Sequence, residues 1–421
     1  MRPLRVALLG LGTVGRPVAA RLLDAAWRGE VAARGVTPPT LVAIGVRDPG
    51  RPRGVELPDS LRRTDDLMAL AVDPDVDVVV ELIGEPETAR SVIERAIDAG
   101  KSVVTANKAV LGALGPALEA AARTAGVALR FEAAVAGGIP VLGPLVLDLA
   151  ANRIDAVRGI VNGTTNHILT AMARDGRTYE DVLDEAQARG YAEADPTADV
   201  SGADAASKLA ILARLAFGAW PDAGSMRRAA PAVGGDASPG ITPVRSRELA
   251  RAADLGLTIK LIARAQRDAV GGFTSAVTPA AVPQRSPLGE TGGVTNMVEV
   301  IGLPVGRVAF RGPGAGGEAT ASAVLADLLA LARGEGSTWG PLPPAGSAPA
   351  PADGLDAPCA WYFATPDFAA GIPARVTEVA LVSSEEAIVT RPMHLGELRA
   401  RLADFYEADL TLYPVLEMGP S

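Results

Sequence analysis

Short apolar segments alternate with helix-length stretches over the first hundred residues of the chain. Four of these segments have the length and composition of buried strands, and they cover residues 6–9, 41–46, 76–83 and 102–105. Strands separated by helical intervals are typical of βαβ units, in which a parallel sheet is covered by helices. We therefore expect the chain to begin with an α/β, doubly wound domain.

The pattern changes at about residue 151, where longer helices are mixed with strands such as 155–161 and 272–277. This mixture predicts a second domain of the α+β class. A helix expected at 319–332 follows a glycine-rich turn and returns to the first domain. Residues 334–358 are rich in Gly, Pro, Ala and Ser, which is typical of a linker. The boundaries that we expect are 1–140 (completed by about 313–333), 141–312, a linker at 334–358, and a small α+β module at 359–421.

Composition narrows the class of protein. The 421 residues suffice for two or three domains, and 48% hydrophobic with 21% charged residues is ordinary for a globular enzyme. A net charge of −9 argues against a nucleic-acid partner. The single cysteine, Cys359, excludes an intrachain disulfide, and two histidines leave too few ligands for a zinc site of the Cys/His type. We expect a reducing, cytoplasmic compartment.

The start of the chain could be mistaken for a secretory signal, because Arg2 and Arg5 precede the apolar run 6–9. Three glycines at positions 10, 12 and 15 interrupt that run, however. No stretch of 18 or more apolar residues follows, so we expect neither a signal peptide nor a membrane span.

The three glycines form a nucleotide-binding motif. Gly10, Gly12 and Gly15 stand in the order GLGTVG, directly after the expected strand 4–9 and before a helix expected at 18–26. In this context the glycines allow a tight turn and a close approach to a pyrophosphate at the helix N-terminus. The sequence therefore predicts a Rossmann domain that binds a dinucleotide.

The residues after the second strand bear on which dinucleotide binds. An acid at this place usually holds the adenosine ribose, but here Arg47 and Asp48 follow the strand, with Arg51 and Arg53 beyond them. Because cations suit a 2′-phosphate, the sequence favours NADP, while Asp48 leaves NAD open. A solvated arginine-rich loop is the alternative interpretation.

The chain has only four lysines among 40 basic residues, and two of them, Lys108 and Lys208, lie in motif-like stretches. Lysine can exchange a proton when its pKa is lowered, whereas arginine cannot, so these positions are candidates for acid/base chemistry. Lys108 follows the strand 102–105 at its carboxyl end, where open α/β sheets bind their ligands. Alternatively, Asn107 and Lys108 only begin the next helix.

Asp204 and Lys208 are four residues apart on a helix expected at 203–217, so they share a face. The helix is apolar nearly all round, and burying both charges without a task would be costly. We therefore expect an active-site pair rather than a surface ion pair. The acidic loop 190–199 lies just upstream, and one of its carboxylates could hold a substrate ammonium; a solvated loop is the alternative.

Several motifs in the first 330 residues together resemble those of the homoserine dehydrogenase family. They are GLGTVG at 10–15, TANK at 105–108, EAAVAGGIP at 132–140, NGTTN at 162–166, the stretch 190–208, and GPGAG at 312–316. The resemblance implies reversible, NAD(P)-dependent reduction of L-aspartate 4-semialdehyde to L-homoserine, a step towards threonine and methionine. The alternatives are another Rossmann dehydrogenase of a small amino-acid carbonyl, or a non-catalytic NADP-binding regulatory protein.

The resemblance also implies a role for individual residues. Lys208 would donate the proton to the aldehyde oxygen, Glu193 and Asp204 would bind homoserine, and Lys108 would help to polarise the carbonyl. The cofactor NADP, or NAD, would be contacted by Gly10, Gly12, Thr13, Val14, Gly15, Arg47, Lys108, Gly190 and Gly316.

A monovalent cation, sodium, is a further implication. Glu132, Val135, Gly137 and Ile139 would ligate it largely through main-chain oxygens. The glycine-rich segment ending in proline suits a bent backbone whose carbonyls converge. The family resemblance further implies a homodimer or tetramer, formed through the second domain.

Two departures from the family pattern are visible. Glu85 follows Gly84 where the family often has a second glycine, which affects local cofactor contacts. The C-terminal module has the position and length of a regulatory ACT domain, but the Asp-x-Pro-Gly turn expected after 361–363 is absent. Feedback inhibition by threonine therefore does not follow. The module is interpreted as a degenerate ACT domain or as a dimerisation element.

Overall fold

The computed structural model describes residues 2–346, 352–355, 357–365, 378, 380–384, 386–403 and 409–416. Parts of the expected linker 334–358 and of the expected module 359–421 lie outside these residues. The chain divides into two compact units. Unit 1 comprises Met1–Arg153, Ala210–Trp220 and Gly312–Ala348, and unit 2 comprises Ile154–Leu209, Pro221–Arg311 and Pro349–Ser421.

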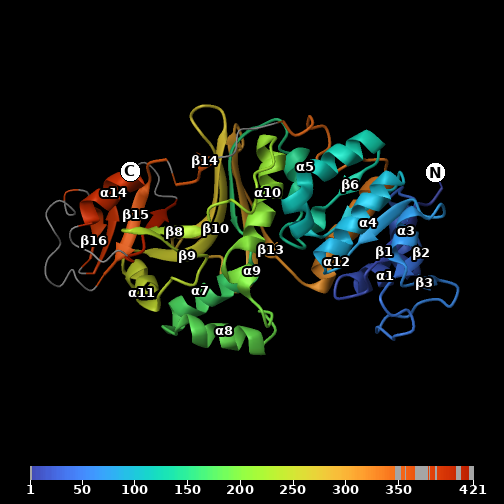
Figure 1. Ribbon diagram of the computed structural model, residues 1–421, viewed down its shortest axis with the longest axis horizontal. Coiled ribbons are helices and arrows are strands. Elements are labelled where there is room, and N and C mark those ends of the chain that lie inside the picture. Colours follow the sequence, from blue (N-terminus) through green and yellow to red (C-terminus); the bar gives the residue numbers. More distant parts are fainter. Residues whose placement is uncertain are drawn as a thin grey trace. The chain divides into compact units, whose positions relative to one another are not determined.

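Unit 1 contains the parallel sheet that the apolar pattern predicts, with the strand order β3-β2-β1-β4-β5-β6 in the described residues (Figure 1). Neighbouring strands of this sheet pair in parallel throughout the described residues. This confirms the doubly wound α/β class. The strands are β1 (Arg5–Leu9), β2 (Thr40–Gly45), β3 (Arg62–Thr64), β4 (Val78–Glu81), β5 (Ser102–Thr105) and β6 (Leu129–Arg130).

The helices of unit 1 pack in two groups. α1 contacts α12, while α4 contacts both α3 and α5. Val6 and Leu8 of β1 share one apolar core with Val18 of α1 and Val324 of α12, all four fully buried. Helix α12 therefore completes the unit that the N-terminal segment begins. The helices are α1 (Gly15–Leu23), α2 (Ala25–Ala33), α3 (Leu67–Val72), α4 (Pro86–Asp98), α5 (Lys108–Ala125), α6 (Leu142–Val146), α12 (Gly317–Ala332) and the 3₁₀ turn η1 (Glu132–Ala134).

One helix boundary differs from the sequence prediction. The single helix expected at 18–26 is two helices, because Asp24 adopts an extended conformation and its carboxylate accepts a hydrogen bond from the Ala26 amide. Asp24 thereby ends α1 and provides the N-cap of α2. Asp is a strong N-cap residue, and this local preference overrides the helical periodicity.

Unit 2 is built on a mixed sheet with the order β13-β12-β7-β10-β11-β18-β15-β17-β16, and β14 pairs with β11. β10 and β11 pair antiparallel along their whole length. The strands are β7 (Arg153–Ile160), β10 (Leu257–Arg267), β11 (Phe273–Pro283), β12 (Thr295–Leu303), β13 (Gly306–Pro313), β14 (Ala352–Asp353), β15 (Ala360–Ala364), β16 (Ala380–Ser383), β17 (Ala387–Thr390) and β18 (Tyr413–Val415), with β8 (Ala229–Ala232) and β9 (Gly235–Pro239) as a separate pair.

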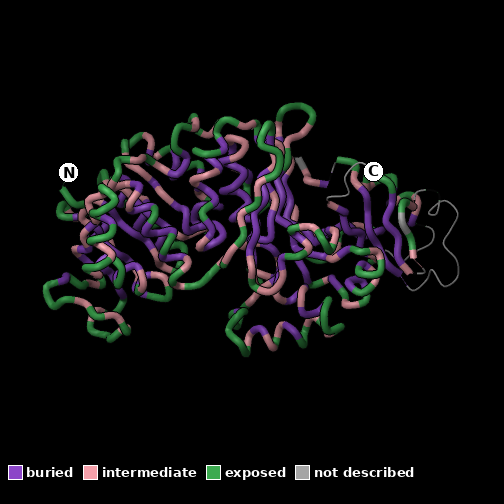
Figure 2. The backbone as a smooth tube through the Cα atoms, turned by 180° about the vertical axis from the view of Figure 1, so that it is seen from behind, coloured by how far each residue is buried: buried purple, intermediate pink, exposed green. Residues whose placement is uncertain are grey.

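The helices of unit 2 are α7 (Gly163–Asp175), α8 (Tyr179–Ala188), α9 (Thr197–Val200), α10 (Ala203–Phe217), α11 (Ser246–Asp254) and α14 (Leu395–Leu402). Helix α10 has the bounds that the sequence predicts, and its last residues, from Ala210, belong to unit 1. Figure 2 shows that the strands of each unit are mostly buried while the outer turns of the helices are exposed.

The described part of the C-terminal segment extends the sheet of unit 2. β18 pairs parallel with β11, and β15 pairs antiparallel with β18. Trp361 and Phe363 of β15 are fully buried, in a core that also contains Val233 from the β8–β9 region. The expected boundary at 359 and the ACT assignment stay predictions. Among the helices of the described residues, none is long and apolar enough to cross a membrane.

Candidate functional site

The glycine loop between β1 and α1 is a tight turn with open space on one side. Gly10 has a φ of +100°, and a Cβ placed there would lie 2.4 Å from the Leu82 carbonyl oxygen. A Cβ on Gly15 would lie 2.0 Å from the Gly10 carbonyl oxygen, so α1 begins in close contact with the turn. A Cβ on Gly12 would meet no atom within 4 Å. The loop thus fits a pyrophosphate, because its backbone is accessible where a ligand must approach.

A second turn lies against the glycine loop. A Cβ on Gly317 would lie 2.5 Å from the Thr13 carbonyl oxygen. Gly316, with a φ of +118°, is the N-cap of α12. The structure therefore brings Gly316 to the loop that carries Thr13 and Val14, although they are some 300 residues apart in sequence.

A cavity of about 310 Å³ lies beyond the carboxyl end of β2, between the glycine loop and the segment that follows β2. Leu11 and Ile44 line its apolar side, and three arginines, Arg51, Arg53 and Arg63, line its polar side together with one acid, Asp59. The Nε atom of Arg53 is buried without a hydrogen-bond partner in the described residues. This arrangement fits an anionic group. Arg47 is exposed. Arg63 lines the cavity but was not predicted to do so, because it lies in β3, which is next to β2 in the sheet and not directly after it in sequence.

Lys108 is the first residue of α5, and it is partly buried. The N-cap is Asn107, whose side-chain oxygen accepts a hydrogen bond from the Val110 amide at 3.2 Å. The capping role that the sequence left open thus falls to Asn107. Lys108 lies one turn beyond β5, at the carboxyl edge of the parallel sheet.

Lys208 and Asp204 form a buried ion pair near the start of α10. The Lys208 Nζ atom donates to Asp204 Oδ2 at 2.7 Å and to the Val161 carbonyl oxygen at 2.7 Å. Their side chains are only 11% and 9% exposed. Asn162 donates through Nδ2 to Asp204 Oδ2 at 2.9 Å and to Asp199 Oδ1 at 2.7 Å. Two carboxylates therefore meet at the Asn162 amide, and one of them, Asp204, also holds the Lys208 ammonium.

Asn162 has a second task, because it is also the N-cap of α7. Its Oδ1 atom accepts a hydrogen bond from the Thr165 amide at 2.9 Å. The side chain thus fixes the start of α7 with its oxygen and the carboxylates with its nitrogen. The NGTTN motif contributes to the family resemblance, but no role for Asn162 follows from it. The preference of Asn for N-cap positions is the signal in the sequence that indicates one.

The acidic loop that follows α8 is held to its neighbours by neutral groups. Gly190 has a φ of +72° and turns the chain out of α8. Thr164 donates to the Tyr191 carbonyl oxygen at 2.9 Å, and Gln187 donates to that of Glu193 at 3.0 Å. The Glu193 side chain is exposed. The loop therefore has a fixed backbone and an accessible carboxylate, in the same unit as Lys208.

The segment expected to ligate sodium is sharply bent. Ala136 and Gly137 have φ values of +54° and +55°. A Cβ on Gly137 would lie 2.6 Å from the Gly314 carbonyl oxygen, so only glycine fits at this position. The described residues contain no cluster of three or more His, Cys, Asp or Glu side chains suited to a metal ion.

The Glu132 side chain has another task. Its Oε1 atom accepts hydrogen bonds from the amides of Val141 and Leu142, both at 2.8 Å, and Oε2 accepts one from Gly143 at 2.9 Å. The carboxylate thus caps the first turn of α6. Any ligation by Glu132 would therefore use its main-chain oxygen, as the resemblance implies.

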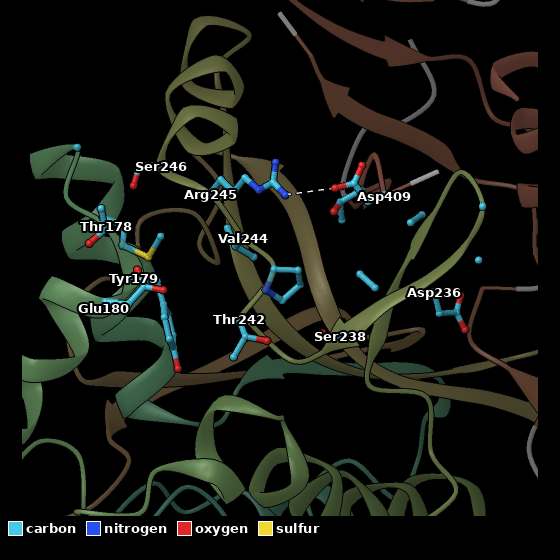
Figure 3. A pocket seen from close by; sticks show the side chains of 18 residues that line it. Thr178, Tyr179, Glu180, Asp236, Ser238, Thr242, Val244, Arg245, Ser246 and Asp409 are labelled. Atoms are coloured by element: carbon cyan, nitrogen blue, oxygen red, sulfur yellow. Dashed lines mark hydrogen bonds and ion pairs between the residues drawn. The ribbon is translucent and has the colours of Figure 1, made fainter. Parts of the chain in front are cut away.

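A larger groove of about 860 Å³ lies elsewhere in unit 2 (Figure 3). It is formed by the α7–α8 turn, the β8–β9 hairpin and residues 242–246, and Arg245 pairs with Asp409 across it at 3.4 Å. None of the predicted site residues lines this groove. The residues that the sequence predicts for the reaction therefore lie elsewhere. Lys208 and Asp204 are in unit 2, and the glycine loop 10–15 is in unit 1.

Comparisons with known proteins identify the family to which the chain is similar. The family model for the homoserine dehydrogenase NAD binding domain matches residues 10–132, and the model for homoserine dehydrogenase matches residues 140–329. The chain is 44% identical to homoserine dehydrogenase of Synechocystis sp. over 329 residues, which are 77% of this chain and 72% of that protein. It is 45% identical to the Mycobacterium tuberculosis homoserine dehydrogenase over 336 residues, 79% and 73% of the two chains.

Solved structures give the same result. A homoserine dehydrogenase from Thiobacillus denitrificans superposes with a TM-score of 0.84 and 34% identity, covering 100% of this chain and 99% of that chain. A hyperthermophilic archaeal homoserine dehydrogenase in complex with NADPH has a TM-score of 0.62 and 25% identity, covering 78% and 97%. With a nucleotide-binding unit, a buried lysine–carboxylate pair and relatives of this similarity, the chain belongs to the homoserine dehydrogenase family of NAD(P)-binding oxidoreductases.

Proposed function

We propose that the chain reversibly reduces L-aspartate 4-semialdehyde to L-homoserine, with NADP as its cofactor and Lys208 as its proton donor. The observation that carries this assignment is the buried Lys208 ammonium, held by Asp204 and by the Val161 carbonyl oxygen. An ammonium in a partly desolvated position is well suited to exchange a proton with an alcohol oxygen.

In this proposal the cofactor supplies the hydride, which adds to the aldehyde carbon. Lys208 gives a proton to the aldehyde oxygen in the same conversion, so that aldehyde, hydride and proton together make the alcohol. In the reverse direction Lys208 takes the hydroxyl proton. Asp204 fixes the Lys208 Nζ atom and keeps its positive charge compensated. Lys108 is the residue that we assign to polarise the carbonyl, as the family resemblance implies.

The carboxylates of unit 2 recognise the amino-acid end of the substrate. Glu193 is exposed on a loop whose backbone is fixed, and it is available to a substrate ammonium. Asp204 is the second acid that we assign to homoserine. Asn162 holds Asp204 and Asp199 at one amide, which supports a defined orientation for the acids of this cluster.

The preference for NADP rests on the arginines beyond β2. Arg51, Arg53 and Arg63 line one cavity, and the buried Arg53 Nε atom is a donor suited to a 2′-phosphate. The change Arg53→Ala is expected to raise the KM for NADP about tenfold and to leave the KM for NAD nearly unchanged. The exposed Arg34, which lies at the end of α2, provides the matched control Arg34→Ala.

A sodium ion bound by main-chain oxygens of Glu132, Val135, Gly137 and Ile139 is part of the proposal. The bent segment supports it, because positive φ values at Ala136 and Gly137 turn successive peptide groups. Rates in sodium chloride, potassium chloride and tetramethylammonium chloride at equal ionic strength test it. A sodium-specific gain in activity is expected, and equal rates in all three salts contradict it.

The reaction itself is tested by the initial rate of NADP reduction with L-homoserine, with L-threonine as the comparison substrate. We expect turnover with homoserine, and oxidation of NADPH with aspartate 4-semialdehyde. If the protein binds NADPH but is silent with both substrates, it is an NADP-binding regulatory protein instead. Turnover with a different amino-acid carbonyl would favour another Rossmann dehydrogenase.

A further inference from the structure

Glu81 is a fully buried carboxyl group at the carboxyl end of the parallel sheet. It is the last residue of β4, and it pairs in register with Leu9 of β1 and with Thr105 of β5. Its side chain is 0% exposed. Burying a carboxyl group costs free energy unless its oxygens are hydrogen-bonded. The contacts that offset this cost are informative about its role.

Both oxygens of Glu81 accept hydrogen bonds from neutral donors. The Thr105 hydroxyl donates to Oε2 at 2.5 Å, and the Ile83 amide donates to Oε1 at 2.5 Å. The Thr105 hydroxyl oxygen accepts in turn from the Asn107 amide at 3.0 Å, and Asn107 Nδ2 donates to the Ile83 carbonyl oxygen at 3.3 Å. These four residues form a closed ring of hydrogen bonds, which we call the Glu81 ring.

The Glu81 ring joins two turns that carry nucleotide-binding features. Its Asn107 is the N-cap of α5, and Lys108 is the next residue. Its Ile83 follows Leu82, whose carbonyl oxygen lies against Gly10 so closely that a Cβ there would approach it to 2.4 Å. The ring therefore lies behind both the start of α5 and the glycine loop.

We propose that Glu81 is a positioning residue, whose carboxyl group sets the Lys108 turn and the glycine loop in the one relative geometry that NADP and the substrate carbonyl require. The inference rests on the proposed role of Lys108. It deepens the proposed function, because it connects the residue that polarises the carbonyl to the loop that binds the pyrophosphate through a single buried side chain.

The chemistry of the ring also predicts which substitution can replace Glu81. Burial raises the pKa of the Glu81 carboxyl group from 4.5 to about 7, while its hydrogen bonds oppose this rise. The neutral acid is therefore populated near neutral pH. Glutamine has the same shape and can accept from the Ile83 amide with its oxygen, while its nitrogen lies beside the Thr105 hydroxyl. Glu81→Ala and Thr105→Val each remove a hydrogen bond of the Glu81 ring.

The experiment measures NADPH binding by the fluorescence of the nicotinamide and steady-state kinetics with homoserine. Glu81→Ala and Thr105→Val are each expected to weaken NADPH binding and to raise the KM for NADP about tenfold, since the first removes the acceptor of two buried donors and the second removes a donor to a buried carboxyl group. The KM for homoserine should change by less than about threefold, because Glu193 and Asp204, which we assign to its amino-acid end, lie in unit 2, whereas kcat should fall because Lys108 is displaced. Glu81→Gln and Thr105→Ser should keep the NADPH affinity and the KM for NADP within about threefold of the wild-type values.

The control is Glu87→Ala, which removes an exposed carboxylate from the first turn of α4. A folded Glu81→Ala protein with wild-type NADPH affinity and wild-type KM for NADP overturns the proposal. If Glu81→Ala does not fold, the two Thr105 variants provide the test. Equal NADPH affinity and equal KM for NADP in Thr105→Val and Thr105→Ser overturn the proposal. NADPH binding needs no turnover, so a wild type that is inactive with homoserine refutes the proposed function and still leaves this test decisive.

Discussion

At the scale of single residues, Asn162 shows what the sequence could and could not predict. The pair Asp204 and Lys208 follows from a spacing of four on one helix, and the structure confirms that they share a buried face. Asn162 joins that pair from a position 42 residues before Asp204, and it also binds Asp199, which is 37 residues from it. No local pattern predicts such contacts, because they depend on how the start of α7 meets α9 and the first turn of α10.

The two tasks of Asn162 can be separated by substitution. Asn162→Asp retains a good N-cap for α7 but replaces the amide donor by a third carboxylate beside Asp199 and Asp204. We expect kcat/KM for homoserine to fall about tenfold or more, with NADPH affinity unchanged. Asn162→Ala removes the cap as well, so it should also lower stability by about 1 kcal/mol. Wild-type kcat/KM for Asn162→Asp would show that the amide donor is dispensable.

Lys260 is a buried lysine for which sequence reasoning gave no role. Its side chain lies in unit 2, and Nζ donates to Asn166 Oδ1 at 3.1 Å, to Thr170 Oγ1 at 3.2 Å and to the Thr291 carbonyl oxygen at 3.0 Å. Burial lowers the pKa of Lys260 from 10.5 to about 8. The residue connects β10 to α7, the helix that Asn162 begins.

The lowered pKa of Lys260 predicts a pH dependence of stability. Between about pH 8 and 10.5 the unfolded chain holds the proton and the native protein has lost it, so the free energy of unfolding rises with pH. The slope is at most about 1.4 kcal/mol per pH unit for this group. Urea unfolding at several pH values should show a flatter slope for Lys260→Met than for the wild type or for Lys101→Met. Parallel slopes for all three proteins would contradict the prediction.

At the scale of elements, β1, β2, β4, β5 and helix α10 lie where the sequence predicts them to within about two residues, whereas the short strands β3 and β6 of unit 1 were not expected. The apolar periodicity of the predicted elements is strong, and no capping residue interrupts it. The error at α1 and α2 arose because one cap, Asp24, outweighs the periodicity around it. Helix α6 has five residues and was not expected, since so short an element has little periodicity of its own.

Helix α6 depends on the carboxylate of Glu132, which accepts three of its first amides. Glu132→Ala leaves those buried donors unpaired, so it should lower the free energy of unfolding by about 2 kcal/mol or more. Urea unfolding measures this, and Glu318→Ala, which removes an exposed acid from the first turn of α12, is the control. An equal effect of the two substitutions would exclude the capping role. The main-chain oxygen of residue 132 is retained, so sodium dependence should persist.

At the scale of the whole molecule, the sequence predicts the class of each part better than the way that distant segments pair. The glycine loop and βαβ pattern suffice for the Rossmann sheet, and the return of α12 to α1 follows the second glycine-rich turn. The pairing of β18 with β11 could not be predicted, because strand partners far apart in sequence are selected by tertiary packing. The homodimer, the ACT interpretation and the domain boundaries stay predictions.

The central claim is that Lys208 transfers the proton in homoserine oxidation. The most direct measurement is the rate of homoserine-dependent NADP reduction by the wild type, Lys208→Ala and the control Lys101→Ala, with NADPH binding measured in parallel. We predict that Lys208→Ala lowers kcat about 10²- to 10⁴-fold while it still binds NADPH, and that Lys101→Ala is unaffected. A Lys208→Ala protein that oxidises homoserine at the wild-type rate would contradict the assignment.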